Sequence, residues 1–303
     1  MGERQGRWND NSRNHHWWPR CLSKFWKGED GEVRCIKPDG KIKTSKKRIK
    51  GFGSYLNWHK KTDQISDWWP KEKIEYLFQK ADDDFPDVIE QLETLSTDKR
   101  VQHETNLQTG GKLIDADDYQ KLYHCCASLI VRSPCFRNRI SQGIEKYPWF
   151  QNSNHGLQET VVGNIERSFD KIESLIARSG KKFCFYAEEN EFVFGDGFFN
   201  SATMSVTTIS PSYFAGIIPL TPKIAFGFRT PSLGYSGFRL LTIGRTSVEN
   251  INRLTMGYAK EHVFFRNGQP KIIDEYKVNE FKTLDEDKSI WFDEFCRSFG
   301  RNS

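Results

Sequence analysis

The segment Asn14-His15-His16-Trp17-Trp18-Pro19-Arg20-Cys21-Leu22-Ser23-Lys24-Phe25-Trp26 brings two imidazoles, three indoles and a proline into one short span near the N-terminus. Adjacent indoles are costly to leave in water, so we expect this segment to pack against the body of the protein and the rest of the chain to be organised around it. Leu22, Phe25 and Trp26 follow Pro19 at helical spacing, which predicts a short helix that begins near the proline.

The chain beyond this segment predicts an α+β protein, with one domain over residues 14–303 after a flexible N-terminus over 1–13. The first part of the domain, 14–61, contains a basic hairpin. Residues 32–37 and 41–44 are expected to be its two strands, because Pro38-Asp39-Gly40 between them is a strong turn.

The remaining two parts differ in hydrophobic periodicity. Residues 70–180 have the periodicity of helices, which are expected after Pro70, after Pro86, from Asp115 to Pro134, from Phe136 and from Leu157 to Ser179, with a connection over 98–114. Residues 181–303 predict strands at 183–187, 191–194, 215–219, 223–228 and 262–265, an irregular stretch at 229–244, and helices from Thr246 or Ser247 to about Lys260 and at 290–299. We expect this last part to form an antiparallel-leaning sheet with a helix packed against it.

Charge is distributed unevenly along the chain. Residues 1–61 hold 16 Lys and Arg against 6 Asp and Glu, a balance of +10, whereas the whole chain of 303 residues carries +5. A basic, aromatic-rich head on a mildly acidic body predicts a polyanionic partner, with nucleic acid as the first candidate. The alternative is that the basic strands are simply solvated.

Seven cysteines are present without a Cys-x-x-Cys pair, a pattern that fits a reducing compartment better than a disulfide framework or a zinc finger. No apolar run reaches the roughly 18–20 residues that a membrane span needs, and the N-terminus lacks the apolar core of a signal peptide. We therefore expect a cytoplasmic protein with no membrane partner.

His16 and Asp196 are the first candidate catalytic residues. Because His15 and His16 are adjacent, they point to opposite sides of an extended segment, which leaves His16 as the candidate base or metal ligand. Asp196 ends an apolar strand between Gly195 and Gly197, where glycine lets a ligand approach the backbone. The structural alternatives are a histidine that caps backbone or stacks on tryptophan, and an aspartate that satisfies the backbone of its own turn.

Asn252 and Arg132 complete the predicted catalytic set. Asn is unfavourable inside a helix, so Asn252 needs a reason such as a buried hydrogen bond. Arg132 ends an apolar helix and is the candidate for steadying a phosphate; its alternative is pairing with a carboxylate or with helix carbonyls. Asp196 and His16 are also the candidate ligands of a divalent metal, whose presence the sequence leaves open.

A second set of residues is predicted to bind nucleic acid, because it combines cations that can contact phosphates with indoles that can stack on bases. These residues are Arg20, Lys24, Lys46, Lys47, Arg48, Trp17 and Trp18. Alternatively, the tryptophans form a dimer interface, which would make a homo-oligomer.

Several short motifs occur in a fixed order along residues 14–266. They are His16-x-x-Pro19-x-x-Leu22-x-x-Phe25, Val131-Arg132-Ser133-Pro134-x-Phe136-Arg137, Phe194-Gly195-Asp196, Pro219-Leu220-Thr221-Pro222 and Ile251-Asn252. This order resembles a bacterial family, the domain of unknown function family forty-two thirty-eight. Trp18 stands where the family usually has Val, and Gly195 replaces its usual Ser. The resemblance implies a cytoplasmic bacterial protein and supplies no activity.

Two functions follow from these residues as hypotheses. The first is a nuclease-like hydrolase that acts on nucleic acid or a nucleotide, with a role in phage defence, in which His16, Asp196, Arg132 and Asn252 converge. The second is a non-catalytic module that binds nucleic acid or a protein. In that case the polar motif residues are buried hydrogen-bond anchors, and the basic hairpin is the working surface.

Overall fold

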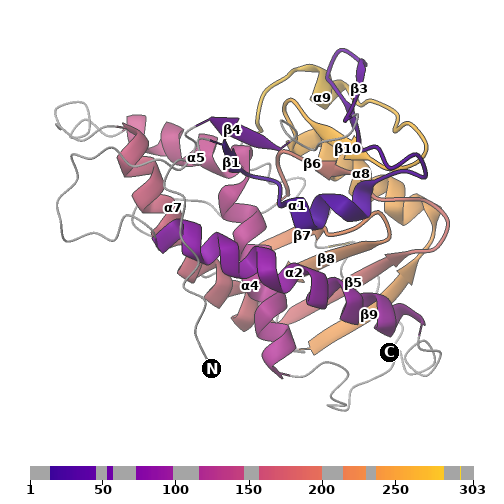
Figure 1. Ribbon diagram of the computed structural model, residues 1–303, viewed down its shortest axis with the longest axis horizontal. Helices are drawn as coiled ribbons and strands as arrows, with labels where there is room; N and C mark the ends of the chain where they lie inside the picture. The colour runs from indigo at the N-terminus through magenta and orange to yellow at the C-terminus, as the bar shows by residue number, and fades with distance from the viewer. Residues whose placement is uncertain are drawn as a thin grey trace, which may run out of the picture.

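The computed structural model describes residues 14–45, 53–56, 73–97, 116–146, 157–199, 214–229, 237–282 and Glu294. These residues form the predicted α+β protein, with helices on the left and centre of Figure 1 and two four-stranded sheets on its right. The predicted flexible N-terminus at 1–13 and, apart from Glu294, the final helix at 290–299 lie outside the described residues.

The N-terminal segment begins as a strand and continues as a short helix. Its elements are β1 (Asn14–His16), which pairs antiparallel with β4 (Ser54–Leu56), then α1 (Arg20–Ser23) and the 3₁₀ helix η1 (Lys24–Trp26). Pro19 precedes the first helical turn, as predicted. Leu22 and Trp26 are buried, and the Trp26 indole N–H donates to the Leu220 carbonyl at 3.3 Å. This hydrogen bond ties the segment to the C-terminal part of the chain.

The basic hairpin is present as β2 (Arg34–Ile36) and β3 (Ile42–Thr44), and Gly40 takes a φ of 83° in the predicted turn. The hairpin belongs to a small sheet of order β3-β2-β10-β6, completed by β10 (Val263–Phe265) and β6 (Phe194–Gly195). The sequence assigns the strands around 194 and 262–265 to the C-terminal sheet, and that assignment is wrong. The Trp18 ring explains the difference, because it stacks on both Phe264 and Phe194 and so holds β10 and β6 beside the N-terminal segment.

The helical middle consists of α2 (Lys73–Thr97), α4 (Ala116–Arg132), α5 (Pro134–Glu145) and α7 (Leu157–Arg178). Pro86 lies inside α2, so the two helices predicted after Pro70 and Pro86 are one helix. The buried residues Ala81, Phe85, Ile89 and Leu92 continue one apolar stripe across the proline. Their packing offsets the roughly 3 kcal/mol that an interior proline costs.

The larger sheet has the order β7-β8-β5-β9, with α8 (Arg245–Tyr258) and α9 (Asp274–Lys277) following it in the chain. Its strands are β5 (Lys181–Ala187), β7 (Ala215–Pro219), β8 (Ile224–Arg229) and β9 (Gly237–Ile243). β9 pairs in parallel with β5. The prediction that 229–244 is irregular is therefore wrong for the residues of β9. Because Leu240 and Leu241 are adjacent and both half-buried, the alternation that marks a strand in a sequence is missing there. α8 starts after Gly244, so neither Thr246 nor Ser247 caps it.

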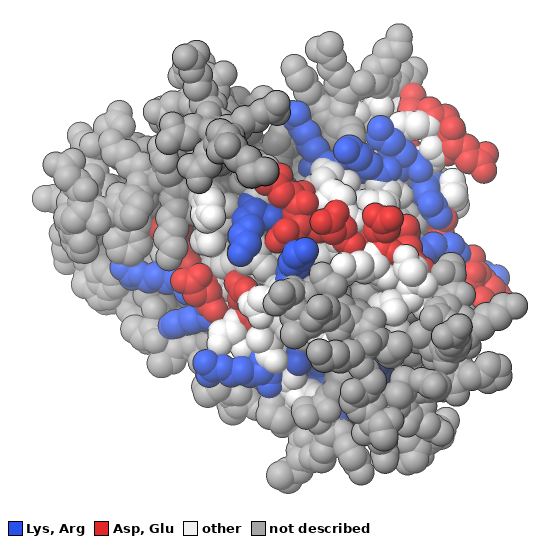
Figure 2. All heavy atoms as spheres, turned by 60° about the horizontal axis from the view of Figure 1, so that its bottom comes forward, with Lys and Arg blue, Asp and Glu red and all other residues white. Residues whose placement is uncertain are grey.

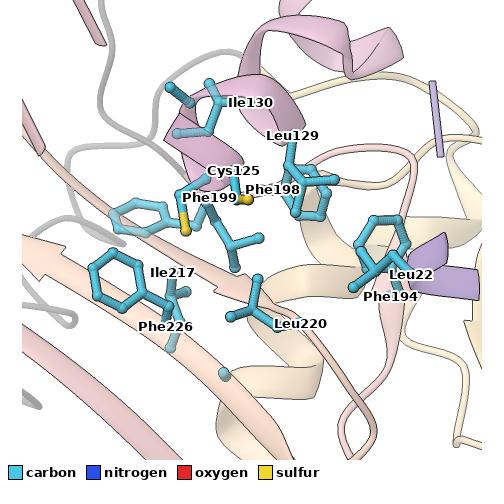
Figure 3. Close-up of a cluster of buried hydrophobic side chains, with 14 of the residues drawn as sticks. Leu22, Cys125, Leu129, Ile130, Phe194, Phe198, Phe199, Ile217, Leu220 and Phe226 are labelled. Atoms are coloured by element: carbon cyan, nitrogen blue, oxygen red, sulfur yellow. The ribbon is translucent and has the colours of Figure 1, made fainter. Parts of the chain in front are cut away.

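The main core lies where these parts meet. Figure 3 shows the side chains that fill it: Leu22 from α1, Cys125, Leu129 and Ile130 from α4, Phe194 from β6, Phe198 and Phe199 after β6, Ile217 from β7, Leu220 after β7, and Phe226 from β8. The segment that opens the chain therefore contributes to the same core as the central helix and the larger sheet.

Candidate functional site

Asp196, directly after β6, is fully buried, and the protein's own backbone binds its carboxylate. Oδ1 accepts a hydrogen bond from the Lys260 N–H at 2.7 Å, and Oδ2 accepts from the N–H groups of Glu261 and His262 at 2.9 and 3.1 Å. The Asp196 N–H donates to the His262 carbonyl, and the Asp196 carbonyl accepts from the Cys135 N–H. Asp196 thereby joins β6 to the turn between α8 and β10 and to the first turn of α5.

The glycines on either side of Asp196 allow this close approach. A Cβ atom on Gly197 would lie 2.0 Å from the Tyr258 carbonyl oxygen and 2.8 Å from the Cβ of Cys135. A Cβ atom on Gly195 would lie 3.0 Å from the Gly197 carbonyl oxygen. The group that approaches the glycines is therefore the end of α8, which corrects the prediction that they admit a ligand.

His262 and Lys37 extend from the same face of the small sheet as Asp196. The register of β6, β10 and β2 places Asp196 and Lys37 opposite His262 on its two sides. His262 Nε2 lies 2.7 Å from Lys37 Nζ, and Nδ1 lies 3.4 Å from Asp196 Oδ2, beyond the usual range of a strong hydrogen bond. The backbone amides are thus the main partners of Asp196, and Lys37 is the closest polar partner of the imidazole.

Two thiols and one phenol packed around this row are neutral at neutral pH. Burial raises the pKa of the Cys35 thiol to about 12 and also raises the pKa of Cys135. Burial, followed by the charge of Asp196, raises the pKa of Tyr276, whose hydroxyl donates to the Ile36 carbonyl at 2.8 Å. None of these three groups is a thiolate or phenolate nucleophile at neutral pH.

His262 and Lys37 are absent from the candidate residues that the sequence identifies. His262 is 66 residues from Asp196, and Lys37 is 225 residues from His262. Each stands alone in the sequence, and only the pairing of β10 with both β2 and β6 brings the three side chains together. Knowing that 262–265 pairs with the hairpin would have been sufficient to find them.

Asn252 on α8 makes the hydrogen bonds that its position inside a helix predicts. Its Oδ1 accepts from the Val193 N–H at 2.9 Å, and its Nδ2 donates to the Glu191 carbonyl at 2.8 Å. The Glu191 carboxylate in turn accepts from Arg266 after β10. Asn252 therefore fixes the segment before β6 to α8.

Replacing Asn252 with Ala is expected to lower the free energy of unfolding by about 1–2 kcal/mol, because two backbone groups lose their partner. Arg253→Ala is the matched control, since Arg253 is the exposed neighbour on the same helix. Urea denaturation measures both variants. Equal effects of the two substitutions would contradict the anchoring role of Asn252.

Arg132 is bound at the end of α4 by groups from α2. Its Nη1 donates to Asp82 Oδ1 at 2.9 Å, its Nη2 donates to the Phe78 carbonyl at 3.1 Å, and its guanidinium lies 4.3 Å from the centre of the Phe78 ring. The structural alternative for Arg132 is confirmed in both of its forms, a carboxylate and a helix carbonyl. Arg132 fastens α4 to α2.

The four predicted catalytic residues thus lie in different local settings. Asp196 binds the turn before β10, Asn252 binds the segment before β6, and Arg132 binds α2. His16 lies in β1 opposite Ser54, with a half-buried side chain. The contacts of Asp196, Asn252 and Arg132 stabilise the fold. The catalytic role of these three residues and of His16 stays a prediction.

Trp17 and Trp18 do not offer faces to a nucleic-acid base, which corrects their predicted role. Their side chains are 2% and 1% exposed. The Trp18 ring centre lies 4.1 Å from that of Phe264 and 5.1 Å from that of Phe194, and Trp17 stacks at 6.5 Å on Phe194. Burying these rings against the small sheet removes more apolar area from water than stacking on the bases of a mobile nucleic-acid strand would.

The predicted phosphate-contacting cations that the structure describes are exposed. Arg20 and Lys24 lie one helical turn apart on the side of α1 and η1 opposite Leu22 and Trp26, and the exposed Lys27 follows at the next turn. We call Arg20, Lys24 and Lys27 the basic stripe. Lys46, Lys47 and Arg48 lie outside the described residues.

A metal site has little support in the described part of the chain. No group of three or more His, Cys, Asp or Glu side chains is placed there to hold an ion. Asp196, one of the two candidate ligands, has both oxygens in hydrogen bonds with backbone N–H groups.

Comparisons with known proteins add no relative. No family model, curated protein or solved structure matches the chain. The resemblance to the bacterial family of unknown function therefore stays a prediction. Among the described helices, none combines the length and the apolar character that crossing a membrane requires.

Proposed function

We propose that this protein is a non-catalytic module that binds nucleic acid through phosphate contacts made by its basic N-terminal part. The observation that carries the proposal is that two groups of polar residues have different partners. Asp196, Asn252 and Arg132 direct their polar atoms at the protein itself, whereas the basic stripe directs its charges at solvent.

The surroundings of the basic stripe support a polyanion as the ligand. Lys27 pairs with Val33 in an isolated antiparallel β-bridge, and the Ser45 N–H donates to the Val33 carbonyl. Val33 therefore lies between Lys27 on one side and Ser45, the last described residue after the hairpin, on the other. The run Lys46-Lys47-Arg48 follows Ser45 directly in the sequence. Cations such as those of the basic stripe release counterions when they meet a phosphate backbone, which gives affinity without sequence preference.

One face of the molecule carries charges of both signs. Figure 2, in which the bottom of Figure 1 is turned forward, shows a row of acidic side chains with basic ones on either side of it, among the residues that are drawn in colour. Mixed charges of this kind repel as well as attract a polyanion.

The test is binding of a labelled DNA duplex and a labelled RNA duplex at increasing salt. We expect a linear fall of the logarithm of affinity with the logarithm of salt concentration. Combining Arg20→Gln, Lys24→Gln and Lys27→Gln should reduce the slope by roughly one unit for each phosphate contact that is lost.

The matched control is a second triple variant, Lys80→Gln, Lys171→Gln and Arg178→Gln, which removes three exposed cations from α2 and α7. Its salt slope should stay close to that of the unchanged protein. If the unchanged protein binds neither duplex even at low salt, or if both triple variants behave alike, the proposal is wrong. Turnover of either nucleic acid with added Mg²⁺ or Mn²⁺ would instead favour the hydrolase hypothesis.

A further inference from the structure

Lys37 differs in its partner from three other cations in or beside the small sheet. Arg34 pairs with Asp30, Lys41 with Asp39 and Arg266 with Glu191, so each of these cations faces a carboxylate. The partner of Lys37 is the imidazole of His262 instead, at 2.7 Å. Among the described residues, no carboxylate pairs directly with this half-buried ammonium group at the end of the hairpin.

The contact between Lys37 and His262 fixes the proton of the imidazole. An ammonium group only donates hydrogen bonds, so Nε2 must accept, and the remaining proton is on Nδ1, on the side of Asp196. A phosphate oxygen that enters between Nζ and Nε2 needs donors from both atoms. In a neutral ring Nε2 could donate only if the proton moved from Nδ1, which would turn the Nδ1 lone pair toward the Asp196 carboxylate. If His262 takes up a proton instead, both ring nitrogens donate, Nε2 to the phosphate and Nδ1 toward Asp196.

We propose that Lys37 and His262 form a phosphate-binding subsite that takes up one proton when it is filled. The phosphate is that of the nucleic acid, so the inference rests on the proposed function and adds a position to the interface. Lys43 on β3 lies opposite Cys35, between the levels of Val33 and Lys37 along β2. Val33 pairs with Lys27 and is about 13 Å from Lys37 along the strand, so a phosphate backbone that contacts the basic stripe can extend to this subsite.

The charged groups near the subsite are compatible with this proton uptake. Asp196 lies on one side of His262 and Lys37 on the other, so one negative and one positive group face the imidazole. The neighbouring Cys35 and Tyr276 are neutral, Lys260 contacts the ring of Phe281, and Asp39 is paired with Lys41. Glu261 adds a negative charge from the turn before β10.

The experiment measures binding of a labelled DNA duplex at about pH 6 and about pH 8, on either side of the usual pKa of histidine. The unchanged protein should bind more tightly at the lower pH, by at most about tenfold per pH unit for one proton. His262→Gln keeps an oxygen that can accept from Lys37 but cannot take up a proton, so its affinity should be nearly the same at both pH values. Lys37→Gln should weaken binding at both, whereas Lys171→Gln on α7 should leave the pH dependence intact.

Two failures are distinguishable. If the unchanged protein binds DNA and His262→Gln keeps the full pH dependence, the subsite is wrong and the proposed function stands. If the unchanged protein does not bind DNA at either pH, the proposed function itself fails. Circular dichroism and urea unfolding of each variant at both pH values show that the comparison is made between folded proteins.

Discussion

Replacing Asp196 with Asn is expected to lower the free energy of unfolding by about 4 kcal/mol, because the carboxylate is the acceptor for three backbone N–H groups in a fully buried place. An asparagine keeps one acceptor oxygen and turns an NH₂ group toward N–H donors. At least one backbone amide then loses its partner, and two donors face each other. The turn before β10 should loosen first, since all three amides belong to it.

Urea denaturation measures this effect, and Asp39→Asn is the matched control. Asp39 is an exposed aspartate in the hairpin turn that pairs with Lys41, so its replacement should change stability little. An Asp196→Asn protein as stable as the unchanged one would show that the carboxylate is not an anchor.

Replacing Gly197 with Ala is expected to cost more than about 3 kcal/mol or to prevent folding. The new methyl group would be 2.0 Å from the Tyr258 carbonyl oxygen, and that atom belongs to the backbone at the end of α8. Backbone cannot rotate away as a flexible side chain can. The only relief is a shift of α8 away from β6, which would also separate Asp196 from its amide partners.

Gly163 provides the opposite case in the same protein. It lies inside α7, and a Cβ atom there would have nothing within 4 Å. Gly163→Ala should therefore raise stability by about 0.5–1 kcal/mol, because alanine restricts the unfolded chain and favours the helix. A shared thermal unfolding assay compares the two variants, and a stable Gly197→Ala protein would contradict the close approach of α8.

The local elements follow well from the sequence where one pattern decides them. The short helix after Pro19, the hairpin around Gly40 and the helix over 116–132 are confirmed, because caps, turn residues and apolar spacing act within a few residues. Pro86 and β9 are missed for a common reason. In both, burial against distant residues outweighs the local signal, and that burial is invisible until the helices and the sheet are packed.

For the candidate site, too, the sequence does not show contacts between residues that are far apart in the chain. The sequence identifies Asp196 and Asn252 as polar residues that need an explanation, and both are anchors for backbone groups. It does not identify which backbone they hold, nor that His262 and Lys37 lie beside Asp196. Hydrogen-bond partners of a buried carboxylate depend on the strand order, and strand order depends on contacts between residues far apart in the chain.

By itself the sequence determined the α+β class and the basic N-terminal part, because composition and periodicity act through each residue's own affinity for water. For the paired tryptophans it predicted both packing against the protein and stacking on bases. Only the tertiary structure decided that β2 and β3 share a sheet with β10 and β6. That arrangement satisfies the Asp196 carboxylate within the protein and leaves Lys37 facing an imidazole. The physical reason is that a charged group's role depends on which partner is within about 3 Å, and a linear sequence does not contain that distance.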